Sequence, residues 1–152
     1  MKKILLAITL IIASFGVLKA QDGLQLGANL GPTMGMSLKY NANAVNGFEM
    51  VLGYNIPHDG PSFKFMYEYH VALVDNLRMY FGGGFNIGAL HLSNNKHNFD
   101  NGEFAFGIVP TIGVDYSFRG APIAFAFGYE PAINVVSHCQ WSDIAFKVRY
   151  RF

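Results

Sequence analysis

Apolar and polar side chains alternate along most of the chain, and the pattern is clearest at its C-terminal end. Successive side chains of a β-strand point to opposite faces, so strict alternation predicts a strand with one apolar face. The apolar positions of the last twelve residues are Ile144, Phe146, Val148, Tyr150 and Phe152. The alternating positions are Asp143, Ala145, Lys147, Arg149 and Arg151. Residues 141–152 are therefore predicted to form a strand.

Seven earlier segments show the same alternation and predict seven more strands. They cover residues 23–31, 34–41, 47–55, 63–73, 77–89, 103–118 and 123–130. Segments rich in Gly, Pro, Asn and Asp separate them and predict turns and loops, the longer ones at 56–62, 91–102 and 131–140. Pro110 lies on the apolar face of its strand and predicts a bulge or distorted pairing. We expect an all-β fold, an eight-stranded antiparallel up-and-down transmembrane β-barrel.

The number and size of the apolar residues decide which face of the barrel points outward. The apolar face carries roughly forty residues, whereas the interior of an eight-stranded barrel is just wide enough for packed side chains or one small ligand. The other face is rich in Gly and Ala, which suits a narrow lumen. We therefore prefer a membrane barrel to the alternative, a soluble barrel with an apolar interior. Tyrosines near strand ends are expected to form girdles at the two membrane surfaces: Tyr40, Tyr54, Tyr116, Tyr129 and Tyr150.

The first twenty residues have the layout of a secretory signal peptide. Lys2 and Lys3 precede an apolar run that ends at Leu18, and Lys19-Ala20 follow. The run is about fifteen residues, short of the roughly twenty that a membrane-spanning helix needs. We expect residues 1–20 to be removed and residues 21–152 to form one barrel domain in the cell outer membrane, after secretion across the inner membrane.

Charge and cysteine content exclude several classes of function. Without the three lysines of residues 1–20, eight basic residues face ten acidic ones, which gives no case for nucleic-acid binding. The single Cys139 cannot form an internal disulfide. The five histidines share no metal-ligand spacing, so we expect no metal and no cofactor. The expected partners are outer-membrane lipid and lipopolysaccharide, and the protein is expected to be a monomer.

Six basic and six acidic residues have the inward parity of their strands. They are Lys39, Lys64, Arg78, Lys147, Arg149 and Arg151, with Glu49, Glu68, Glu103, Asp115, Glu130 and Asp143. Charges in a confined lumen are costly unless they are paired and hydrogen-bonded, so equal numbers predict a plug of salt bridges. Lys147, Arg149 and Arg151 form a basic row that should find acids such as Glu130 and Asp115. The alternative is a gated path for ions.

The alternation and the terminal Phe152 resemble the small outer-membrane barrels similar to the OmpA transmembrane domain and OmpX. Narrower matches resemble a group of bacterial barrels with a G-E-P-T-G-x-S-x-K-Y start and a G-A-P turn. The matching residues are 31–40 (GPTMGMSLKY, without the Glu), Gly120-Ala-Pro122 and 147–152 (KVRYRF). The resemblance implies an outer-membrane protein. Tyr150 and Phe152 look like the signal that the barrel-assembly machinery recognises.

One short motif suggests an enzyme. His91-Leu-Ser93-Asn94 resembles the H-x-S-N motif of lipid A 3-O-deacylases, which are also eight-stranded barrels. The resemblance implies His91 as general base and Ser93 as nucleophile, and Glu103 could orient the histidine. In that family the motif lies near the C-terminus, whereas three predicted strands follow it here. We therefore expect a structural or surface-interaction protein and keep two alternatives, this deacylase and a narrow transporter of ions or small apolar molecules.

Overall fold

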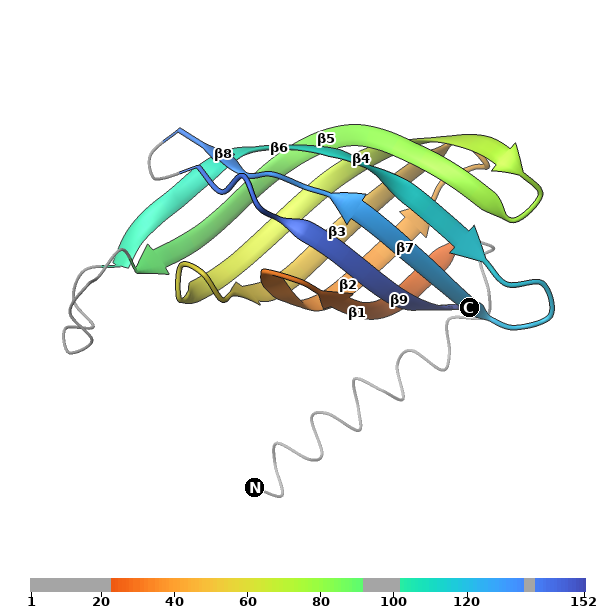
Figure 1. Cartoon of the computed structure of the whole chain (residues 1–152), viewed down its shortest axis with the longest axis horizontal. Helices are drawn as coiled ribbons and strands as arrows, with labels where there is room; N and C mark the ends of the chain where they lie inside the picture. Colours follow the sequence, from red (N-terminus) through yellow and green to blue (C-terminus); the bar gives the residue numbers. More distant parts are fainter. Residues whose placement is uncertain (1–22, 92–101, 136–138) are drawn as a thin grey trace, which may run out of the picture.

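The protein is a closed antiparallel β-barrel, seen from the side in Figure 1. The computed structural model describes residues 23–91, 102–135 and 139–152. Eight long strands form the wall, and β8 is a short extra strand. Their bounds are β1 (Leu24–Leu30), β2 (Thr33–Asn41), β3 (Asn46–Asn55), β4 (Gly60–Val74), β5 (Leu77–His91), β6 (Gly102–Ser117), β7 (Ile123–Tyr129), β8 (Ile133–Asn134) and β9 (Ile144–Arg151). The predicted eight-stranded antiparallel barrel is confirmed.

Each long strand pairs with its neighbour in the chain, and β1 pairs with β9 to close the wall. Closure gives each of the eight long strands a partner on both sides. Both ends of the wall chain lie at one mouth, because Gln25 of β1 is paired with Arg151 of β9. We call this mouth the terminal end; it carries the connections 42–45, 75–76 and 118–122. The opposite mouth, with the connections 31–32 and 56–59, is the loop end.

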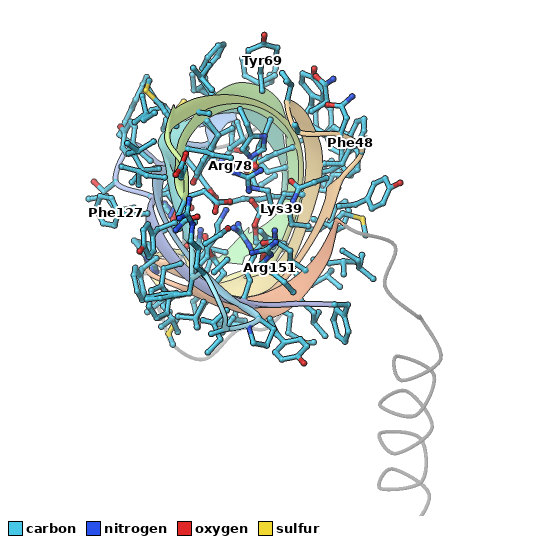
Figure 2. The ribbon with its side chains drawn as sticks, turned by 90° about the vertical axis from the view of Figure 1, so that its right-hand side faces the viewer. Lys39, Phe48, Tyr69, Arg78, Phe127 and Arg151 are labelled. Carbon is cyan, nitrogen blue, oxygen red and sulfur yellow. The ribbon has the colours of Figure 1, made fainter. Side chains whose placement is uncertain are left out.

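The two faces of the wall differ as the alternation predicts. Outward side chains are apolar and exposed, as for Leu52, which is 62% exposed, and Phe127, which is 55% exposed. Figure 2 shows Phe48, Tyr69 and Phe127 pointing away from the ring of strands. Inward positions hold small residues and buried polar ones, among them Lys39 and Glu49. Across the described part of the chain, no helix is long and apolar enough to cross a membrane.

The seventh wall strand is interrupted by two facing prolines. β7 and β8 keep one register against β6, since Ile112 pairs with Tyr129 and Ile108 pairs with Ile133. This register places Pro110 opposite Pro131. Neither proline has an N–H, so the two hydrogen bonds expected at this pair cannot form. The predicted distortion at Pro110 therefore falls on its β7–β8 side, while its pairing with β5 stays regular.

Two predicted loops are shorter than expected. The segment 131–140 was expected to be a loop, but β8 extends the wall and Ala132 pairs with Gln140. The segment 56–62 was also expected to be a loop, but Gly60 and Pro61 already belong to β4. Proline is tolerated at the start of a strand, where fewer ladder hydrogen bonds depend on it. The prolines thus placed the start of β4 too late and concealed β8, while β7 does end before Pro131.

Candidate functional site in the barrel lumen

Among the residues that the structure describes, ten charged side chains in the lumen take part in ion pairs. Five are cations and five are carboxylates. Eight of them come from six of the long strands, and the other two, Glu130 and Asp143, lie directly after β7 and directly before β9. They are Lys39, Lys64, Arg78, Lys147 and Arg149, with Glu49, Glu68, Asp115, Glu130 and Asp143. All but Arg78 are fully buried. We call this set the luminal charge network.

The network begins near the loop end at Asp143. The Lys64 Nζ lies 2.5 Å from Asp143 Oδ2, and the Thr33 hydroxyl donates to the same oxygen at 2.8 Å. Lys64 also lies 3.5 Å from Glu130 Oε2. Glu130 in turn contacts Lys147. Acids on the β7–β8 and β9 sides of the wall are thus neutralised by lysines from β4 and β9.

Glu49 is the centre of the network. Its Oε2 lies 2.8 Å from Lys147 Nζ, and its Oε1 lies 2.6 Å from Arg149 Nη2. The Ser37 hydroxyl donates to Oε1 at 2.5 Å and accepts from Arg149 Nε at 3.0 Å. Both carboxylate oxygens of Glu49 are therefore occupied by charged donors, which offsets the cost of burying it.

Asp115 forms ion pairs with the cations nearest the terminal end. Its Oδ2 lies 3.1 Å from Lys39 Nζ, 3.4 Å from Arg78 Nη2 and 3.9 Å from Arg149 Nη1. Lys39 also pairs with Glu68 at 2.7 Å. His70 Nε2 lies 3.3 Å from the same Glu68 oxygen, Oε2. Ion pairs therefore connect Asp143 near one mouth with Arg78 near the other.

Small inward residues make room for these long side chains. Ala126 lies between Asp115 and Lys147 in the register of β6, β7 and β9. Ala124 occupies the corresponding place beside Arg149. Both alanines are buried. The Gly- and Ala-rich inward face is thus a condition for packing lysines and arginines inside eight strands.

The lumen also contains an apolar cluster that the sequence reasoning did not single out. Val51, Met66, Val109 and Ala132 are buried together inside the barrel. The inward parity of these positions was the only signal that could have found them. The cluster places apolar side chains in the lumen beside the luminal charge network.

Tyr80 fills the lumen between β5 and β7. Its ring is fully buried, and Lys39 Nζ lies 5.1 Å from the ring centroid. Its hydroxyl lies over Gly113 and Gly128, where a Cβ atom would come within 2.5 Å and 2.2 Å of the oxygen. Because neither glycine has a side chain, the tyrosine can lie across the inner face of β6.

Several predicted site residues stand apart from the network. Of the basic row, Lys147 and Arg149 form ion pairs, whereas Arg151 is exposed at the terminal end and forms none with any described residue. His91 ends β5, and its backbone is paired with Gly102. Glu103 pairs through its backbone with Leu90, but its side chain, like that of His91, lies outside the described part. Ser93 also lies outside it, as does the expected signal peptide, 1–20.

No metal-binding group was found among the residues that the structure describes. In residues 23–91, 102–135 and 139–152, no three His, Cys, Asp or Glu side chains are grouped so that they could hold a metal ion. Cys139 is a free thiol, and its Sγ lies 3.8 Å from the carbonyl oxygen of Asn134.

Comparison with solved structures identifies the fold of this chain. No protein-family model matches the chain, and no curated protein matches it. Among solved structures, the N-terminal β-barrel domain of Pseudomonas aeruginosa OprF is similar, with a TM-score of 0.64 and 15% identity, over 87% of this chain and 98% of that one. Neisserial surface protein A matches at a TM-score of 0.47 and 14% identity, over 85% and 93%. Yersinia pestis Ail matches at 0.44 and 13%, over 86% and 94%. The chain has the fold of the small eight-stranded outer-membrane barrels.

Proposed function

We propose that this protein is an integral barrel of a bacterial outer membrane, with a structural or surface-interaction role and a lumen that conducts no ions. The observation that carries the proposal is the polarity of the wall. Large apolar side chains such as Met36, Leu52 and Phe106 are exposed around the outside, while charged groups are buried inside. In water this arrangement would expose a far larger apolar surface than soluble monomers carry.

The backbone pairing and the positions of the aromatic residues both support a wall that faces lipid. Each of the eight long strands is paired on both sides, which satisfies backbone hydrogen bonds that lipid cannot satisfy. Exposed tyrosines lie toward both ends of the wall, Tyr40 and Tyr150 near the terminal end and Tyr54 near the loop end. Such girdles are typical of membrane interfaces. Outer-membrane lipid and lipopolysaccharide are the partners we propose for this surface.

A closed lumen is supported by two separate features. The luminal charge network pairs cations with carboxylates from Asp143 to Arg78, so a passing ion would have to break buried ion pairs. The apolar cluster of Val51, Met66, Val109 and Ala132 offers no ligand for an ion. These features favour a plug over the narrow ion path that equal numbers of charges also allow.

The outward aromatic residues of β9 support recognition by the assembly machinery. Tyr150 is exposed, and its ring lies 5.2 Å from that of Phe152 in an edge-on arrangement. Both residues belong to the segment that closes the wall against β1. We propose that this pair marks the chain for insertion. A surface-interaction role would fall to the loop-end connections, since loops on a rigid scaffold carry recognition.

Membrane fractionation combined with heat-modifiable gel migration tests the proposal. A folded outer-membrane barrel should be recovered with the outer membrane and migrate faster before heating than after it. The same purified protein in planar bilayers should give no steps of nanosiemens order. Recovery as a soluble periplasmic protein would refute the membrane assignment, and regular conductance steps would refute the plug.

A further inference from the structure

The terminal end of the barrel contains a cavity of about 710 Å³ that none of the proposed roles uses. Strands β1, β2, β5, β6 and β9 contribute to its wall, together with the turns at this mouth. Its lining includes the polar residues Gln25, Asn41, Arg78, Ser117 and Arg151. In the view of Figure 2, Arg78, Lys39 and Arg151 lie inside the ring of strands. We call this space the terminal cavity.

The terminal cavity is open at the mouth of the barrel and closed toward the rest of the lumen. Lys39, Asp115 and Arg149 lie deeper in the barrel and are buried, with 1% exposure or less. Their ion pairs separate the cavity from the rest of the lumen. The volume falls in the range of small-molecule sites, roughly 300–1,000 Å³. A dead-ended space of this size is suited to holding a ligand.

Two arginines face this space with donors to spare. Arg78 has a side chain that is 22% exposed, and a single Nη2 contact with Asp115 at 3.4 Å uses little of its guanidinium. Arg151 has no ion-pair partner in the described ranges and is exposed. Arg78 lies on β5 and Arg151 lies on β9, and β6 and β7 stand between these two strands in the sheet. The two side chains therefore enter the cavity from different parts of the wall. A ligand between them could contact both.

Uncharged groups beside the arginines also lack partners. Gln25 is 2% exposed, and its Oε1 has no hydrogen-bond partner among the residues described. The Oδ1 of Asn41 is in the same state. A buried amide without a partner costs free energy, and a ligand with donors or acceptors would remove that cost. An amide can present either its oxygen or its NH₂ group, so these two side chains can complement a polar ligand.

The charge around the cavity sets the sign of the ligand. Arg78 and Arg151 are the cationic residues of its lining, and Asp75 is the acidic residue there. Asp75 is already paired with Arg119, which lies outside the lining. The planar guanidinium group binds carboxylates and phosphates through two parallel hydrogen bonds. We propose that the terminal cavity binds a small oxyanion, a ligand that carries a carboxylate or phosphate group and enters from the side of the chain ends.

Titration of the folded protein in detergent micelles with inorganic phosphate, and separately with citrate, tests this site by NMR. Saturable shifts are expected at the Arg78 and Arg151 side-chain N–H groups and at the Gln25 and Ser117 amides. Saturation by phosphate alone assigns a phosphate ligand, and saturation by citrate alone assigns a carboxylate ligand.

Two arginine variants separate a site from general surface charge. Arg151→Gln should raise the dissociation constant about fivefold or more, because one charge-assisted contact is lost. Arg119→Gln removes an exposed cation from the same end, outside the cavity lining, and releases Asp75 from its ion pair, so it should weaken binding less than Arg151→Gln does. Equal weakening by both variants, or shifts that never saturate, would overturn the proposal. Neither result depends on membrane fractionation or conductance, so the two proposals can fail separately.

Discussion

Arg149 Nη2 lies 2.6 Å from Glu49 Oε1, and both side chains are completely buried between β9 and β3. Glu49 also neutralises Lys147, so removing its charge leaves two buried cations short of a partner. Glu49→Gln should therefore lower the free energy of unfolding by about 3 kcal/mol or more. Denaturant titration in micelles, followed by gel migration and Trp141 fluorescence, measures the loss.

The exposed pair of Arg119 and Asp75 provides the matched control for this prediction. Their side chains are 68% and 83% exposed. Asp75→Asn should change the free energy of unfolding by no more than about 0.5 kcal/mol, because an exposed pair is screened by water. If the two variants proved equally stable, the buried network would not be what holds the lumen together.

Tyr80 and Gly128 are coupled by contact. A Cβ at position 128 would lie 2.2 Å from the tyrosine hydroxyl, so Gly128→Ala should destabilise the barrel by about 1–3 kcal/mol through overpacking. The hydroxyl has no hydrogen-bond partner in the described residues, so Tyr80→Phe should cost little by itself. Combined with Gly128→Ala, it should recover part of the loss. Strictly additive effects in this double-mutant cycle would contradict the contact.

Pro110 and Pro131 face each other where the pairing of β7 ends. Pro131→Ala supplies an N–H that points toward the β6 side, because the neighbouring Glu130 N–H donates to Asp143 on the β9 side. The new amide at position 131 should exchange slowly with deuterium and extend β7 into β8. The gain from one such bond is about 1 kcal/mol at most. Fast exchange at position 131 would show that the interruption has another cause.

Thiol labelling tests whether the lumen is closed. In a Cys139→Ser background, a cysteine replacing Val109 should react with a charged thiol reagent on the order of a hundredfold more slowly than one replacing Arg151, which is exposed. Val109 belongs to the apolar cluster and is fully buried. Comparable rates at the two positions would mean that solvent and ions reach the middle of the barrel.

The wall could be predicted from the sequence because a period of two residues directly assigns each side chain to a face. Leu52 and Lys39 fall on the expected faces for this reason. The ends of strands were predicted less well: Pro61 and Pro131 suggested loops, but their neighbours remain paired. Proline marks a local loss of backbone hydrogen bonds more reliably than it marks the end of a strand.

The ion-pair partners inside the lumen could not be predicted from the sequence, because they depend on the register between strands. Within one strand Lys147, Arg149 and Arg151 look equivalent. The register of β9 against β1 carries Arg151 to the rim beside Gln25, while Arg149 stays opposite Gly27 and reaches Glu49. The apolar cluster was missed for a similar reason, since Val51 and Val109 come together only when the sheet closes.

The seam between β1 and β9 joins the first strand of the barrel to the last, as in the pairing of Leu26 with Tyr150. Closing so long a loop carries a large entropic cost, and it cannot begin until the final strand is available. Until then, β1 and β7 each present an unpaired edge, which is a template for aggregation. Both edges therefore stay exposed until β9 (Ile144–Arg151) pairs with β1, so this last strand determines when the risk of aggregation ends.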